Sequence, residues 1–191
     1  MTVYRISDRL DEYQAVTTTP DDIAIQLGDF DLFERIILQA VENRSLQDIW
    51  HSVDVEFEDV LNDGSLLPDI SLWLRTYLVL SPKAYEILKH DLQKDGEFLP
   101  IRYKNCQWYL YTALKFGQED TQKCVEKIEY GSPAGLEILV FIDSDIENKI
   151  IFKSQMEGVG SLYCTDKFKS LCEDHRLNGI AFSTDLTSPF E

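Results

Sequence analysis

The chain has 191 residues and a mass of 22.1 kDa, which is enough for one or two compact units. Its composition, 44% hydrophobic and 12% aromatic with nine glycines and six prolines, is that of a folded protein and excludes large disordered segments. The net charge of −16 disfavours nucleic acid and anionic membranes as partners, and no apolar run or signal-peptide pattern points to a membrane, so we expect a cytoplasmic protein.

The negative charge is concentrated toward the N-terminus. Residues 1–75 carry 16 acidic and 5 basic side chains, whereas residues 76–191 carry 18 and 13. We therefore predict an acidic N-terminal lobe over residues 1–66 and an α+β domain over residues 67–191, and we expect the two to form one compact unit. Such a lobe speeds encounter with a basic partner, although solubility alone explains an acidic surface equally well.

The first strong periodicity spans residues 29–43 and predicts an amphipathic helix with an acidic first turn. The side chains expected on its buried face are Phe30, Phe33, Ile36, Ile37, Ala40 and Val41.

Within residues 53–60, the first six residues alternate strictly between apolar and acidic side chains, which predicts a half-buried strand. Successive carboxylates on its outer face stand about 6.6 Å apart, and their repulsion favours a cationic partner. The alternative is a solvated edge strand that its charges protect from aggregation. As the partner-binding residues we predict Asp54, Glu56, Glu58 and Asp59.

The middle of the chain predicts a strand, a capped helix and two more strands. Ser81 is the expected helix cap, with Pro82 at the first helical position. Residues 97–101 predict the next strand, the pair Lys104 and Asn105 a hairpin turn, and residues 106–114 an aromatic strand.

The last third predicts a second unit of the same kind. After a polar connection, residues 136–142 are almost wholly apolar and predict a central strand, followed by a turn at 143–148 and a hairpin partner at 149–153. Residues 162–182 then repeat the strand, capped helix and strand, with Thr165 in the place of Ser81 and Gly179 in that of Gly96. The expected fold is α+β with mixed, mainly antiparallel sheets; internal duplication and two uses of a common solution both explain the repeat.

No catalytic motif is present, so we expect no enzyme activity and no cofactor. The glycines near Gly158 match neither a dinucleotide nor a phosphate loop. Cys164, Cys172 and His175 could converge on zinc, but a fourth ligand is missing and both cysteines fit a buried stripe. Residues 143–148 lack the glycine and final glutamate of a calcium loop.

Several of these stretches together resemble a known family. They are LPDISL, LVLSPKAYEIL, GEFLPI and WYLYTAL, followed by KIIFK and LYCTDKFKSLCEDHRLNGIAF, which together extend from Leu67 to about Phe182. This pattern resembles immunity protein family eleven of bacterial polymorphic toxin systems, long catalogued as a domain of unknown function. The chain departs from it after the aromatic strand, where KFGQEDTQKC replaces the usual Leu-Asp and Ser pattern.

The resemblance implies a cytoplasmic protein that binds and neutralises a cognate toxin without catalysis. The acidic lobe agrees with this, because a toxin that acts on nucleic acid needs a cationic active site. Two alternatives remain at this point. One is an enzyme with a dispersed, metal-dependent site around Cys164, Cys172 and His175, and the other is an adaptor or chaperone for a secreted effector.

Overall fold

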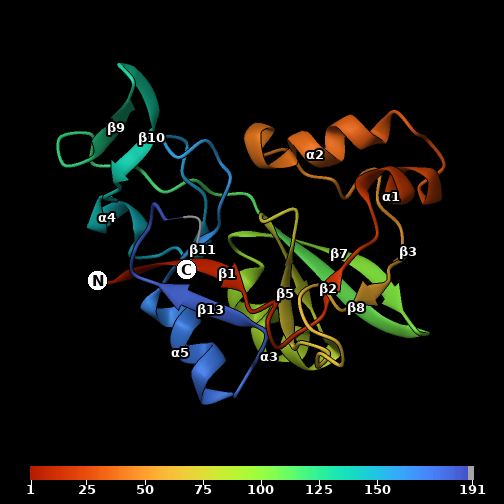
Figure 1. The fold of residues 1–191 in the computed structure, drawn as a ribbon. Coiled ribbons are helices and arrows are strands. Elements are labelled where there is room, and N and C mark those ends of the chain that lie inside the picture. Colours follow the sequence, from red (N-terminus) through yellow and green to blue (C-terminus); the bar gives the residue numbers. More distant parts are fainter. Residues whose placement is uncertain (189–191) are drawn as a thin grey trace.

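The structure, a computed structural model, describes residues 1–188 and has the predicted α+β fold (Figure 1). Two larger sheets and two small two-stranded sheets account for its strands. Within the described residues, no helix is long and apolar enough to span a membrane.

The larger sheet has five strands in the order β3-β7-β8-β6-β5. Its strands are β3 (Val53–Asp54), β7 (Gly96–Tyr103), β8 (Cys106–Ala113), β6 (Tyr77–Leu80) and β5 (Ile70–Trp73). All neighbours are antiparallel except β3 and β7, which are parallel. The turn between β7 and β8 is the predicted one: Lys104 and Asn105 have φ angles of 46° and 65°, which fits a hairpin turn with both central residues left-handed.

The second sheet has four antiparallel strands in the order β11-β12-β1-β13. Its strands are β11 (Ile151–Phe152), β12 (Tyr163–Thr165), β1 (Val3–Asp8) and β13 (Ile180–Ser183). The first strand of the chain therefore lies among the last ones. Since β3 also joins the five-stranded sheet, residues 1–66 contribute strands to both sheets.

Both predicted strand-helix-strand units are present, and they share one spatial order of strands. In the first, helix α3 (Pro82–Leu92) connects β6 to β7, which lie on either side of β8. In the second, α5 (Asp166–Asp174) connects β12 to β13, which lie on either side of β1. The strands outside them correspond as well, because β5 pairs with β6 as β11 pairs with β12. The sequence similarity of the two units thus extends to their strand order.

The five-stranded sheet has a core on each face. Helices α1 (Pro20–Gln26) and α2 (Leu32–Glu42) cover one face, where Ile23 and Ile36 pack with side chains such as Val79 and Leu110. Helix α3 lies on the opposite face (Figure 1), within a core that also includes side chains of α5 and the four-stranded sheet.

The structure corrects the prediction for residues 125–153. Strands β9 (Val125–Glu129) and β10 (Ser132–Ile138) form an exposed hairpin that projects from the body (Figure 1), so residues 136–142 are no central strand. Only Leu139 and Phe141 of that run are buried, next to Phe152 and Tyr163. Helix α4 (Asp143–Ile146) replaces the expected turn, and β11 pairs with the later strand β12 and not with the preceding run. The apolar run signalled burial, but the partner that buries it lies elsewhere in the chain.

Candidate partner-binding surface

The acidic segment, residues 53–60, has the predicted alternation but is not one strand. Val53, Val55 and Phe57 are buried, whereas the carboxylates between them are exposed. Strand β3 belongs to the five-stranded sheet, and β4 (Phe57–Glu58) pairs with the short strand β2 (Ala15–Val16). The backbone of Glu56 joins the two pieces: its N–H donates to Thr18 Oγ1 at 2.8 Å, and its carbonyl accepts from the N–H of Thr17 at 3.0 Å.

Two of the four predicted partner-binding carboxylates have partners within the chain. Asp54 accepts two hydrogen bonds from the guanidinium of Arg102, which holds the pKa of Asp54 below its usual range. Asp59 accepts from Gln14 Nε2 at 2.9 Å and from the N–H of Gly64 at 2.7 Å, and these bonds lower the pKa of Asp59. Asp59 therefore closes its own loop.

Glu56 and Glu58 are exposed and form no ion pair within residues 1–188. Glu56 and Asp54 line an open groove of about 380 Å³ between α1 and the acidic segment. We call it the acidic groove; its lining residues are Thr18, Asp22, Ile25, Gln26, Asp54 and Glu56. Glu58 and Asp59 are not among them, so the structure brings together two of the four predicted residues.

Asp22 is the third carboxylate of the acidic groove, and the sequence reasoning missed it. It lies in the first turn of α1, where the helix dipole favours a negative charge. The N–H of Asp22 donates to Thr19 Oγ1 at 3.2 Å, and the N–H of Thr19 donates back to the Asp22 carboxylate at 3.2 Å. This capping box and Pro20 at the first helical position could have predicted the start of α1 from the sequence. The helix places Asp22 beside the acidic segment.

Most of the acidic charge of the N-terminal region is not neutralised within the chain. Of the 16 carboxylates in residues 1–75, four lie in ion pairs with a lysine or arginine: Glu12, Asp48, Asp54 and Asp69. The other twelve have no such pair within the described residues; eleven of them are exposed, and Asp8 is partly buried. The sequence contains no lysine before Lys83, so this region holds only its five arginines as counter-charges. The result is a strongly anionic surface.

Helix α2, beside the acidic groove, is anchored to the sheet by buried hydrogen bonds. The hydroxyl of Tyr77 donates to the carbonyl of Ile36 at 2.7 Å, and that of Thr112 donates to Gln39 Oε1 at 2.6 Å. The carboxylate of Glu97 accepts from the N–H of Leu46 at 2.7 Å and from the hydroxyl of Ser45, just after the helix. Glu97 is 3% exposed. Nothing in the sequence indicated this role, because Glu97 there is only one residue of a predicted strand.

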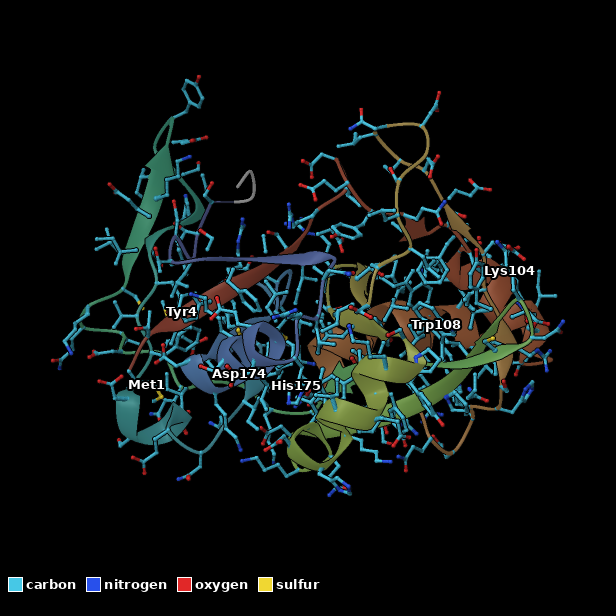
Figure 2. All side chains as sticks on the ribbon, turned by 90° about the horizontal axis from the view of Figure 1, so that it is seen from below. Met1, Tyr4, Lys104, Trp108, Asp174 and His175 are labelled. Carbon is cyan, nitrogen blue, oxygen red and sulfur yellow. The ribbon has the colours of Figure 1, made fainter. Side chains whose placement is uncertain are left out.

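The residues considered for zinc do not form a site. Cys164 and Cys172 are buried in the core, and burial raises the pKa of both thiols, that of Cys172 to about 12. His175 is exposed at the end of α5 (Figure 2). Within residues 1–188, no three His, Cys, Asp or Glu side chains are grouped so that they could hold a metal ion.

The calcium-like run is likewise engaged within the chain. The carboxylate of Asp145 in α4 accepts from Lys149 Nζ at 2.5 Å and from the N–H of Gln118 at 2.7 Å.

No protein-family model matches the chain. The search of curated proteins found no match either. The resemblance to immunity family eleven therefore stays a prediction from its motifs.

Proposed function

We propose that this protein is an immunity protein that binds and neutralises a cognate bacterial toxin through its acidic N-terminal surface, without catalysis. The observation that carries the proposal is the uncompensated charge, because eleven exposed carboxylates of residues 1–75 form no ion pair within residues 1–188. The exposed carboxylates of residues 1–75 repel one another, which opposes folding. Binding of a basic protein surface relieves that repulsion. We expect the binding face to include the acidic groove, with Asp54 and Glu56 on one side and Asp22 on the other.

The mechanism is occupation of a cationic surface. A toxin that acts on a polyanionic substrate holds cationic side chains at its active site, and an anionic protein can occupy that site and exclude the substrate. The chain's own carboxylates bind and orient the partner; no bond is made or broken. Among the predicted set, Glu56 and Glu58 are the carboxylates that remain available for such contacts.

The test uses the product of the gene immediately upstream of this one, which we expect to be the toxin. Co-expression should restore growth, and calorimetry on the purified proteins should show a stoichiometric complex that abolishes the toxin's activity. Replacing Asp54, Glu56 and Glu58 together by lysine should weaken binding, mainly by slowing association. The matched control reverses three exposed carboxylates of other elements, Glu86, Glu147 and Glu173, and should change binding little.

Two results would contradict the proposal. One is unchanged association of the triple-lysine variant, which would place the contact elsewhere. The other is a complex in which the toxin keeps its activity, since an adaptor or chaperone and not an inhibitor would then be the better description.

A further inference from the structure

Helix α2 presents an apolar stripe to solvent, next to the face that packs on the sheet. Phe33, Ile37 and Val41 are four residues apart and share one helix face. Phe30, just before the helix, stacks on Phe33 with ring centroids 6.3 Å apart and planes 7° apart. Phe30 is 59% exposed, Ile37 41% and Val41 58%, whereas Phe33 is partly buried and also packs against the core. We call these four residues the α2 stripe.

The stripe is held rigidly. The adjoining face of α2 buries Ile36, Gln39 and Ala40 against the sheet, and Tyr77 and Thr112 fix the helix by hydrogen bonds. A preformed apolar surface loses little conformational freedom when a partner covers it. Single exposed apolar side chains are common, but a row of them along one anchored helix marks an interaction surface.

The charges around the α2 stripe indicate the charge that its partner carries. Four exposed carboxylates lie along or next to the helix, Asp29, Asp31, Glu34 and Glu42, and one exposed cation, Arg44, lies just beyond its end. Arg35 is the one cation of α2, and Asp48 and the carbonyl of Ser45 engage it. Glu42 lies in the last turn, where the helix dipole favours a cation.

A second copy of the chain would bring like charges together here, and an anionic membrane would be repelled. The surface instead complements a segment with apolar side chains between lysines or arginines.

We propose that the α2 stripe binds a basic amphipathic segment of the partner, with apolar anchors on Phe30, Ile37 and Val41 and cations at Glu34 and Glu42. This inference rests on the proposed function and names the segment of the partner that is bound. The carboxylates set the rate of association, and the apolar contacts set the rate of dissociation.

The first test uses a probe of the same chemistry, a helical peptide of about 14 residues, four turns, built from leucine on one face and lysine on the other. Amide NMR shifts should concentrate in residues 30–42. Replacing Phe30, Ile37 and Val41 by serine should weaken peptide binding at least about tenfold, because each loses an apolar contact. These side chains are exposed, so the variant should keep its fold, which its thermal unfolding checks.

The matched control replaces Val125, Ile128 and Ile138, which are equally exposed on the β9–β10 hairpin, by serine and should bind as well as the parent chain. A peptide with glutamate in place of lysine should not bind. The inference is overturned if the shifts concentrate in the hairpin or in residues 60–67, or if the stripe variant binds the peptide unchanged. Dimerisation of the chain alone that the serine variant abolishes would also overturn it, since a second copy would then be the occupant.

A second test separates this inference from the proposed function. If the parent chain neutralises the toxin and the stripe variant dissociates from it at the parent rate, the inference fails while the function stands. If the parent chain does not bind the toxin but the peptide maps to α2, the function fails while the basic amphipathic ligand class stands.

Discussion

Arg102 lies directly opposite Asp54 in the parallel pairing of β3 and β7 and holds its carboxylate with two hydrogen bonds, from Nε at 2.6 Å and from Nη2 at 2.8 Å. Both side chains are about half exposed, so the pair adds little to stability. Its main effect is electrostatic, because it places a cation at the rim of an otherwise anionic groove.

Replacing Arg102 by glutamine should therefore speed association with a basic partner. The change removes that cation and lets the pKa of Asp54 return toward its usual value, at which the carboxylate is still ionised at neutral pH. Stopped-flow association at low salt measures the effect. The control is Lys169→Gln on α5, which frees Glu173 in the same way at another place and should leave the rate unchanged. Slower association of the Arg102 variant would show that Arg102 itself contacts the partner.

Glu97 should contribute to the stability of the fold, although the protein as a whole is acidic. Its buried carboxylate holds the N–H of Leu46 and the hydroxyl of Ser45. Glu97→Ala leaves the buried N–H of Leu46 without a partner and should lower the free energy of unfolding by about 2–4 kcal/mol. Urea unfolding measures this. The exposed Glu58→Ala should change the same quantity little, and equal losses in the two variants would contradict the assignment.

Lys153 should make stability depend on pH. The side chain is fully buried, its Nζ has no hydrogen-bond partner within residues 1–188, and burial lowers its pKa from 10.5 to about 7. Below about pH 7 the native state must bury a charge, whereas between about pH 7 and 10.5 the native amine is neutral and the unfolded one is still protonated. This group's contribution to stability therefore rises with pH across that window.

Lys153→Met should remove the free-energy cost of burying this amine. We expect the variant to be more stable than the parent by about 2–4 kcal/mol at pH 6, with a gain that shrinks as the pH approaches 10. Denaturant unfolding at several pH values checks both parts. The control Lys94→Met, at an exposed position, should show no such pH-dependent gain. A Lys153 variant that is less stable at pH 6 would show that the contact of Nζ with the Phe116 ring, 5.2 Å from its centroid, outweighs the cost of burial.

Local patterns predicted the parts of the fold that local chemistry determines. The alternation of residues 53–58, the Ser81 cap, which accepts from the N–H of Ala84 at 3.1 Å, and the turn at Lys104 and Asn105 are all present. Each depends on neighbours within a few residues. The pairing of β11 with β12 and of β1 with β13 joins distant segments, and no local signal specified it.

The helix at residues 29–43 shows that periodicity predicted the helix but not which of its apolar residues are buried. The helix is present as α2, and Ile36 and Ala40 are buried as predicted. Phe30, Ile37 and Val41 were expected on the same buried face and are exposed instead. Apolar residues occupy most of the circumference of this helix, so its sequence could not say which part meets the sheet. The proposed α2 stripe was hidden in that ambiguity. Asp22 lies outside this helix, on α1, where the capping box of Thr19 and Asp22 was the signal that was missed.

The salt dependence of association with the toxin tests the central claim most directly. If the anionic N-terminal surface recognises a basic partner, the association rate constant should fall at least about tenfold as ionic strength rises from about 0.02 to 0.5 M, because salt screens the charges that steer the encounter. Over the same range the dissociation rate constant should change much less. An association rate that does not depend on salt would contradict the account.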